Sequence, residues 1–258
     1  TKVLTCRSLA AEPHDRRLRF AAKSGLKHDA VSLTGRQAVA VVWRTYAQAR
    51  IEEMAAHAGV PVVNALTDDY HPCQILADLL TITERKGDLA GLTMAYVGDG
   101  ANNMAHSYLL GGALAGLHVR IGTPLSHPPQ AGIRARAEAI AAQTGGSITV
   151  TDDPYAALTR ADVVITDTWV SMGMEAEKES RHGAGSPFEK FAVTPDLMAH
   201  ADPAAIFLHC LPAYRGYEVA AEVIDGPQSV VWDEAENRLH AQKAVLSWLL
   251  AQAADGVA

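Results

Sequence analysis

The stretch LTMAYVGDGANNMAHSYLLGGALAGLHVRIGTP, residues 92 to 124, decides the fold. It opens with a short apolar run, turns at GDG and continues with apolar residues that recur every three or four positions. A second strand-like run, HVRIGTP, closes it. A strand, a helix and a strand in this order form a parallel βαβ unit, because the crossover helix returns the chain to the same end of the sheet. The stretch therefore predicts a parallel sheet covered by helices.

The same alternation extends in both directions. Further strands are expected at 38–45, 60–66, 147–153, 163–169, 205–211 and 229–234, and further helices at 48–59, 72–87, 130–144 and 235–253. Parallel strands joined by helices are buried on both faces. We therefore expect an α/β protein with a doubly wound, Rossmann-like parallel sheet. The single βαβ unit before residue 88 is too small to stand alone and predicts a truncated second α/β domain.

The pattern divides the chain into four expected segments. Residues 1–36 are basic, with eight Lys or Arg against three Asp or Glu, and match no element of the pattern. Residues 37–87 hold the remnant of the smaller domain and a linking helix. Residues 88–235 form the larger α/β domain. Residues 236–258 are expected to be a C-terminal helix that packs back on the first domain.

Composition excludes several classes of function. The 258 residues are 48% hydrophobic, enough for a sizeable core, and the formal net charge of −7 argues against a nucleic-acid surface. A small-molecule partner is expected instead. Three cysteines without a CxxC pair argue against a disulfide framework and a structural zinc site, which predicts a reducing, cytoplasmic location and no metal. No apolar run approaches the roughly 18 residues of a membrane span.

Polar residues follow the expected strands where each strand ends. These positions read Gly98-Asp99, Asp167-Thr168-Trp169, His209-Cys210 and Asp233-Glu234. Ligands of open α/β sheets bind outside the carboxyl ends of the strands. The sequence therefore predicts a binding site at this edge. Cys210 is either part of that site or a small buried apolar side chain.

Two motifs before residue 88 suit an anionic ligand. In HPCQ, His71 and Gln74 flank a proline at the expected first turn of a helix, whose N-terminus attracts anions. In VWRT, Arg44 and Thr45 end a strand with a cation and a hydroxyl. Each has a plain alternative, since such a turn is often structural and a lone Arg is often a solvated charge.

The remaining motifs suit an amino acid. GDGANN suggests a dinucleotide site, but Asn103 stands where that motif has its third glycine, and it either caps the helix or binds a carboxylate. Asp167 is either a turn residue or a ligand contact. Ser171 and Met172 open a charged, glycine-containing stretch that is a candidate lid. Arg238 either reaches the same site or pairs with Glu234 or Glu236.

Taken together, these motifs resemble one family. HPCQ (71–74), GDGANNMAHS (98–107), DTWVSMG (167–173), FLHCLP (207–212) and DEAENRLHAQKAV (233–245) occur in the order and spacing of the aspartate/ornithine carbamoyltransferase superfamily, and most closely of its ornithine branch. The resemblance implies transfer of the carbamoyl group of carbamoyl phosphate to L-ornithine, giving citrulline and phosphate in arginine biosynthesis. It implies no cofactor, two substrates held between two α/β domains, and a homotrimer.

The resemblance also implies roles for single residues. Its carbamoyl phosphate contacts are Arg44, Thr45, His71, Gln74, Cys210, Leu211 and Arg238. Its ornithine contacts are Asn103, Asp167, Ser171 and Met172. Its catalytic group is Cys210, Asp167, His71 and Arg44, with Cys210 as the candidate acceptor of a proton from the amine.

The chain departs from the family at one point, and alternatives stay open. The family's Ser-x-Arg-Thr-Arg phosphate motif does not occur in this sequence, so its strongest anion grip is absent and activity of this chain is an open question. One alternative is a non-catalytic amino-acid-binding or partner subunit. Another is an NAD-dependent dehydrogenase with a similar sheet. Putrescine or a modified ornithine remains possible as the acceptor.

Overall fold

A computed structural model describes residues 4–5, 36–170, 175–182 and 185–254 of the chain. The chain divides into two compact units. One holds residues 1–73 and 240–258, and the other holds residues 74–239. The domain boundaries expected at 87 and 235 remain a prediction.

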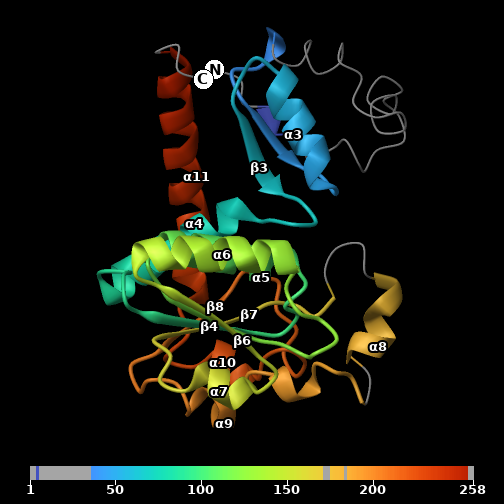
Figure 1. Cartoon of the computed structure of the whole chain (residues 1–258), viewed down its shortest axis with the longest axis vertical. Coiled ribbons are helices and arrows are strands. Elements are labelled where there is room, and N and C mark those ends of the chain that lie inside the picture. Colours follow the sequence, from blue (N-terminus) through green and yellow to red (C-terminus); the bar gives the residue numbers. More distant parts are fainter. Residues whose placement is uncertain (1–3, 6–35, 171–174, 183–184, 255–258) are drawn as a thin grey trace. The chain divides into compact units, whose positions relative to one another are not determined.

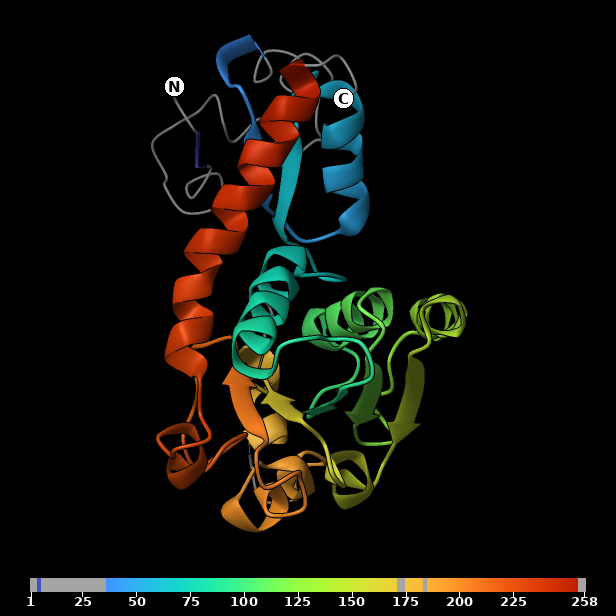
Figure 2. The ribbon, with the colours of Figure 1, turned by 90° about the vertical axis from the view of Figure 1, so that its left-hand side faces the viewer.

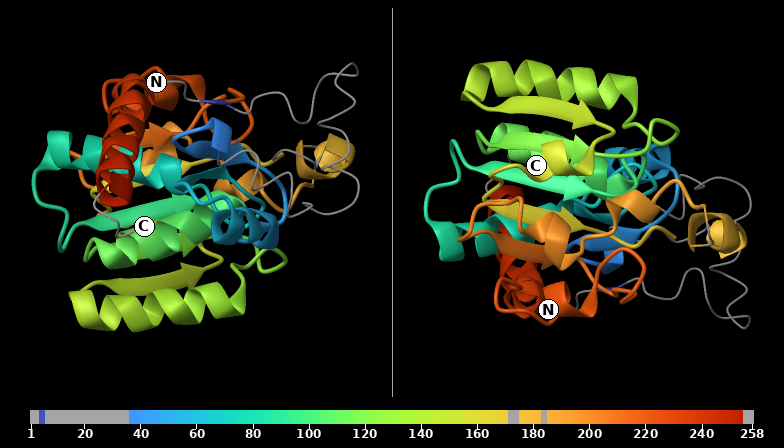
Figure 3. Two further views of the ribbon diagram at one scale, coloured as in Figure 1. Left: turned by 90° about the horizontal axis from the view of Figure 1, so that it is seen from above. Right: turned by 90° about the horizontal axis from the view of Figure 1, so that it is seen from below.

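The larger unit is built on a five-stranded sheet. Its strands are β4 (Thr93–Val97), β5 (His118–Gly122), β6 (Ser147–Thr151), β7 (Val163–Thr166) and β8 (Ile206–His209). They lie in the order β6-β5-β4-β7-β8, and every neighbouring pair is parallel. Figure 3 shows β6 at one edge of the sheet beside α6 (Ala131–Thr144). The predicted α/β class with a parallel sheet is confirmed.

Helices cover both faces of this sheet (Figure 1). One face carries α4 (Pro72–Lys86), α5 (Asn103–Leu114) and α6, and the other carries α7 (Pro154–Leu158), α9 (Pro195–Met198) and α10 (Ala221–Ile224). The 3-10 helix Glu189–Phe191 adds Phe191 to the second face, and α8 (Lys178–His182) and the 3-10 helix Glu175–Glu177 follow β7 in sequence. Burial on both faces explains why β4, β7 and β8 are mainly apolar, whereas the edge strand β6, with the sequence SITVT, is more exposed and alternates.

Alternate residues of β4 serve the two helical layers. Ala95 and Val97 belong to an apolar cluster with Leu158 of α7 and Ile224 of α10. A Cβ atom added to Gly112 of α5 would lie 2.9 Å from the methyl carbon of Met94, so this side of the strand packs tightly against α5. Successive side chains of a strand point to opposite faces, which produces this division.

The strand expected at 229–234 is wrong. Ser229 makes one isolated parallel bridge to Phe207, and α11 (Val231–Ala254) begins two residues later. Asp233 and Glu234 fall in the first turn of this helix, where the positive end of the helix dipole favours acidic residues. The strong helix formers that follow extend the helix backwards over a short apolar run that also suits a strand. Residues 231–239 of α11 belong to the larger unit, and the remainder belongs to the smaller one.

The smaller unit contains the expected βαβ unit. Its parallel strands are β1 (Leu4–Thr5), β2 (Val41–Arg44) and β3 (Val62–Leu66), in that order across the sheet. Helix α3 (Gln48–His57) lies beside β3 (Figure 2). Val41, Trp43, Ile51, Met54 and Ala58 form its buried apolar cluster.

Across the described ranges, no helix has both the length and the apolar character needed to cross a lipid bilayer.

Candidate functional site

The candidate site of the larger unit lies where the order of its strands reverses. β5 and β6 follow β4 in sequence on one side, while β7 and β8 lie on the other. The carboxyl ends of β4 and β7 therefore flank the switch point at which open α/β sheets bind ligands. The chain leaves β4 through Gly98, whose φ of +139° lies in a region that side chains other than glycine rarely adopt. This turn directs the following polar residues towards the end of β7.

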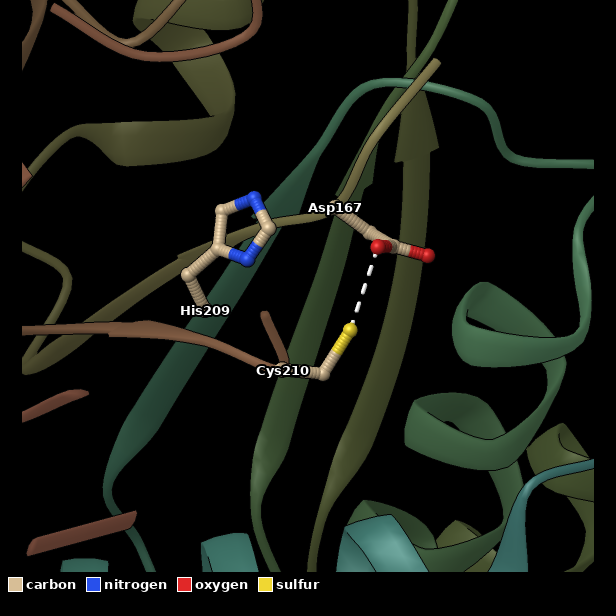
Figure 4. Close-up of side chains that lie close together, drawn as sticks. All are labelled: Asp167, His209 and Cys210. Carbon is tan, nitrogen blue, oxygen red and sulfur yellow. Dashed lines mark hydrogen bonds between the residues drawn. The ribbon is translucent and has the colours of Figure 1, made fainter. Parts of the chain in front are cut away.

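Asp167 and Cys210 meet at this edge. β7 and β8 pair with Thr166 opposite His209, so the next residues of the two strands are Asp167 and Cys210. The Cys210 Sγ atom donates a hydrogen bond to Asp167 Oδ1 at 3.1 Å, and Figure 4 shows the thiol pointing at the carboxylate. Asp167 is therefore a side-chain partner of Cys210, and Cys210 is more than a small apolar residue.

Asn102 joins β4 to this pair. Its Oδ1 atom accepts a hydrogen bond from the backbone N–H of Ala105 at 2.8 Å, which caps α5. Its Nδ2 atom donates to the hydroxyl of Tyr96 at 3.0 Å and to Asp167 Oδ2 at 3.4 Å. The alternative in which Asn103 caps the helix is therefore wrong, because the cap is one residue earlier. Asn103 is the first residue of α5 and is half-buried.

Burial governs the protonation of the thiol and the carboxylate. It raises the pKa of the Cys210 thiol well above its usual value, and the negative charge of Asp167 raises it further. Burial also raises the pKa of Asp167. Hydrogen bonds from Cys210 and from the backbone N–H of Thr168, at 2.7 Å, act in the opposite direction and lower this pKa. Cys210 therefore holds its proton at neutral pH and acts as a donor to Asp167.

His209, the last residue of β8, is fully buried and lies close to Asp167 and Cys210 (Figure 4). Its Nδ1 atom accepts a hydrogen bond from the backbone N–H of Leu211 at 2.9 Å, so this nitrogen carries no proton. Its Nε2 atom lies 3.3 Å from Oε1 of the buried Glu218 and is therefore the protonated nitrogen. The neutral imidazole holds the chain in place as it leaves β8, where Leu211 has a positive φ of 54°.

Three side chains of this edge have the ligand types of a metal site. The ligand atoms of Asp167, His209 and Cys210 lie within 4.8 Å of one another. In the structure, however, the thiol donates to the aspartate, and both imidazole nitrogens have partners of their own. We therefore assign no metal to this group.

Gln74, near the start of α4, is held by three charged or ionisable side chains. Its Nε2 atom donates to Asp78 Oδ1 at 2.8 Å and to Glu234 Oε1 at 2.9 Å. Its Oε1 atom accepts a hydrogen bond from Arg238 Nη1. Arg238 thus contacts Gln74 from the first half of α11. The reverse orientation would place the amide oxygen against two carboxyl groups and the amide N–H groups against the Arg238 guanidinium.

Glu234 links Gln74 to the strand that carries Cys210. Its second oxygen, Oε2, accepts a hydrogen bond from the backbone N–H of His209 at 2.8 Å. Asp78 accepts a hydrogen bond from the hydroxyl of Tyr108 at 2.8 Å. Asp78 and Glu234 are both at most 1% exposed. Glu234 was predicted at the polar edge without a role of its own, and Asp78 was not predicted, although it stands four positions after Gln74, where a helix places side chains side by side.

A buried ion pair holds α8 against the end of β4. Arg181 Nη1 lies 2.6 Å from Asp99 Oδ2, and both side chains are almost wholly buried. The same nitrogen donates to the backbone oxygen of Trp169 at 2.9 Å. The segment that follows DTW is therefore tied to the sheet at two points. Ser171 and Met172, the predicted ornithine contacts in this segment, lie outside the described residues.

The remaining predicted residues belong to the smaller unit. Arg44 is the exposed last residue of β2, and the backbone N–H of the buried Thr45 donates to Leu66 O at 3.0 Å. His71 is buried and directly precedes α4, which begins at Pro72 as predicted. The structure thus brings together Asp167 with Cys210, and Gln74 with Arg238, within the larger unit. The expected convergence of both units on one ligand remains a prediction.

Two family models match the sequence. The model described as aspartate/ornithine carbamoyltransferase, Asp/Orn binding domain, matches residues 90–249. The model described as aspartate/ornithine carbamoyltransferase, carbamoyl-P binding domain, matches residues 7–84. The second match begins within the basic segment 1–36, which the motifs alone leave unmatched.

Known proteins agree with these matches. The chain is 66% identical over 224 residues to the ornithine carbamoyltransferase of Clavibacter sepedonicus, covering 87% of this chain and 72% of that protein. It is 60% identical over 222 residues to that of Renibacterium salmoninarum, covering 86% and 70%. The chain therefore spans about 70% of the length of these relatives.

Solved structures give the same result. Ornithine carbamoyltransferase from Pyrococcus furiosus matches with a TM-score of 0.82 and 47% identity, covering 87% of this chain and 70% of that chain. The enzyme from Gloeobacter violaceus matches with a TM-score of 0.79 and 47% identity, covering 86% and 74%.

Proposed function

The chain belongs to the ornithine carbamoyltransferases of the aspartate/ornithine carbamoyltransferase family, and from this premise we propose that it transfers the carbamoyl group of carbamoyl phosphate to the side-chain amine of L-ornithine. The products are L-citrulline and phosphate. The family match argues against an NAD-dependent dehydrogenase, and a non-catalytic amino-acid-binding or partner subunit stays as the second candidate. Activity of this chain and the roles of its residues are parts of the proposal.

The observation that carries the proposal is the thiol–carboxylate pair at the switch point. Asp167 is buried, and hydrogen bonds from Cys210, Thr168 and Asn102 surround its carboxylate. Such a group suits the ammonium of an amino acid, which it can hold without losing its own orientation. In the proposal, Asp167 binds the α-ammonium and Asn103 the α-carboxylate. The distal amine then reaches Cys210.

Gln74 and Arg238 suit the carbamoyl group. Both N–H groups of the Gln74 amide are directed at carboxyl oxygens, so its remaining hydrogen-bonding capacity is a lone pair on Oε1. That lone pair can accept a hydrogen bond from the carbamoyl NH₂. Arg238 supplies positive charge beside the same oxygen. In the proposal, Arg44, Thr45 and His71 contact the phosphate and carbonyl oxygens, where negative charge develops during the attack.

The reaction requires the amine to lose protons. A free alkylammonium has a pKa of about 10.4, so one proton must leave before the amine attacks the carbonyl carbon. A second proton leaves as the C–N bond forms and the bond to the phosphate oxygen breaks. Because the Cys210 thiol is a donor in the structure, it can accept a proton only after it has lost its own.

A citrulline-formation assay tests the proposal on the full chain. Turnover with carbamoyl phosphate and ornithine above a no-enzyme blank supports it, and the same rate in an Asp167→Asn variant would contradict the assigned role of Asp167. Putrescine in place of ornithine tests the acceptor. Calorimetry with ornithine alone separates an enzyme, for which we expect weak binding before carbamoyl phosphate is present, from a simple amino-acid binder.

Assembly and location follow the family as proposals. We propose a homotrimer and a cytoplasmic location. Light scattering coupled to gel filtration gives the mass of the assembly, and a monomer at micromolar concentration would contradict the trimer.

A further inference from the structure

The strongest unexplained feature of the larger unit is its pair of buried acids, Asp78 and Glu234. They come from helices that are far apart in sequence, α4 and α11. Gln74 Nε2 lies 2.8 Å from Asp78 Oδ1 and 2.9 Å from Glu234 Oε1, so these two oxygens are at most 5.7 Å apart. Each carboxyl group is at most 1% exposed. Two carboxyl groups that are this close together and this deeply buried need an explanation.

Double ionisation of the pair is unfavourable. Two negative charges at this separation, at an effective dielectric constant of about 20, disfavour ionisation of the second acid roughly a hundredfold. Burial adds to this effect, because it penalises each charged form. A single proton on the pair removes the repulsion, because only one of the two groups is then charged.

We propose that Asp78 and Glu234 act as one buried carboxyl pair that shares a single proton, and that this pair fixes the Gln74 amide with its oxygen turned away from the pair and towards Arg238. Both acids are positioning residues. The consequence for a ligand, that Gln74 presents an acceptor to the carbamoyl NH₂, rests on the proposed function.

The groups around the pair support a single shared proton. Tyr108 on α5 donates its hydroxyl to Asp78, and the backbone N–H of His209 donates to Glu234. Arg238 on α11 contributes a positive charge that favours ionisation of Asp78, and the negative charges of Glu234 and Asp78 add to the increase in the pKa of the Cys210 thiol. Burial raises the pKa of Asp78 to about 6, and burial together with the charge of Asp78 raises the pKa of Glu234 well above its usual value. A carboxyl pair that carries one proton and one negative charge can accept the hydrogen bonds from Tyr108 and from the His209 backbone.

Carbon-13 NMR of the full chain, labelled at the Asp and Glu carboxyl carbons, tests the shared proton. The Asp78→Asn and Glu234→Gln variants assign the two signals. Between about pH 4 and about pH 9, we expect both carbons to shift together in common steps, with one step far above the usual value near 4. Independent titration of both signals near 4 would overturn the proposal, and so would two carboxyl groups that stay protonated throughout.

The same samples test the orientation of Gln74. Its side-chain N–H signals, assigned by their loss in Gln74→Ala, should lie downfield of those of the exposed Gln143 and exchange slowly with solvent. In the double variant Asp78→Asn, Glu234→Gln they should move towards the Gln143 values. Unchanged Gln74 signals in a folded double variant would overturn the positioning role. If the variants do not fold, the wild-type titration still decides whether the proton is shared.

Asp233→Asn is the matched control. Asp233 directly precedes Glu234 on α11, but its side chain is 44% exposed and pairs with Arg85 at the surface. This variant removes a carboxylate of the same helical turn, and we expect the common titration steps to remain. Their loss in Asp233→Asn would show that the steps do not report on the buried pair.

A ligand comparison tests the consequence for recognition. Acetyl phosphate carries a methyl group where carbamoyl phosphate carries NH₂. The dissociation constant of acetyl phosphate divided by that of carbamoyl phosphate therefore reports on the hydrogen bond accepted by the Gln74 lone pair. We expect the double variant to reduce this ratio roughly 2- to 12-fold, the worth of one neutral hydrogen bond. An unchanged ratio would contradict the positioning role. If neither compound binds the wild type, the proposed function fails for this chain, while the NMR titration still decides on the pair.

Discussion

Asn102 shows how one side chain can serve both the fold and the site. Its side-chain oxygen caps α5, and its side-chain nitrogen donates hydrogen bonds to Asp167 and Tyr96, so both polar atoms of the amide have partners. The sequence indicates that a short polar residue follows β4, but two adjacent asparagines fit the pattern equally well. Only the turn geometry decides which of them becomes the cap. The sequence therefore predicts where the polar edge of the sheet lies, but it does not predict which role each residue at that edge has.

The two asparagines give a test at this scale. Asn102→Ala removes the cap and leaves buried polar partners without their hydrogen bonds, so we expect the free energy of unfolding to fall by about 1–3 kcal/mol. Asn103→Ala, its neighbour, should lower ornithine affinity with a much smaller loss of stability. Urea unfolding and calorimetry with ornithine separate the two effects. Equal destabilisation by both changes would contradict the assignment of the cap.

The thiol–carboxylate pair gives a second test. Because the negative charge of Asp167 raises the pKa of Cys210, Asp167→Asn should lower that pKa and increase the fraction of thiolate. We expect alkylation of Cys210 by iodoacetamide at about pH 8 to become roughly tenfold faster. Peptide mass spectrometry measures each cysteine separately. Cys73, which is buried and donates to Asn64 O at 3.3 Å, is the internal control and should keep its rate.

At the scale of elements, most of the fold follows from the period of the apolar residues. Every strand expected between 92 and 211 is present within a few residues of its predicted bounds. The failure at 229–234 arises because a short apolar run suits both a strand and the start of a helix, and burial by neighbouring elements decides between them. For the same reason Glu234, expected at a strand end, lies on α11. Its role depends on contacts with α4, 160 positions away, which no local pattern reveals.

The buried ion pair between Arg181 and Asp99 ties helix α8 to the residues that follow β4, in addition to the stacking of His182 on Tyr217. Arg181→Gln removes the charge that pairs with Asp99, and we expect amide hydrogen exchange in residues 175–182 to become roughly 10- to 100-fold faster, the worth of a charged hydrogen bond. Mass spectrometry of proteolytic peptides measures it. Arg134→Gln breaks the exposed pair with Glu138 on α6 and should change exchange there very little. Unaltered exchange in α8 would show that other contacts hold the helix.

At the scale of the whole molecule, buried acids set how stability depends on pH. The pKa values of Asp78, Asp167 and Glu234 are all raised by burial, so the folded state keeps protons that the unfolded chain loses above about pH 4. A raised carboxyl pKa therefore removes stability as pH increases from the unfolded value to the folded one. Composition gives the net charge of the chain, but not which acids are buried, so this behaviour is not predictable from the sequence.

Unfolding at different pH values tests this expectation. With a pKa of about 6 against about 3.9 in the unfolded chain, Asp78 accounts for a loss of about 3 kcal/mol as pH rises from about 4 to above 6. Asp78→Asn should flatten the pH dependence of the free energy of unfolding by a comparable amount. Asp233→Asn should leave it as in the wild type. A variant curve parallel to the wild-type curve would contradict the raised pKa.

Glu234 has a consequence for how this chain can be redesigned. One of its oxygens is bonded to the glutamine of HPCQ and the other to the backbone that leads into HCLP. A new acceptor specificity introduced by remodelling either motif would therefore disturb the other through the same carboxyl group. Libraries that vary both motifs together while keeping residue 234 fixed should yield more folded members than libraries that treat the motifs as separate modules.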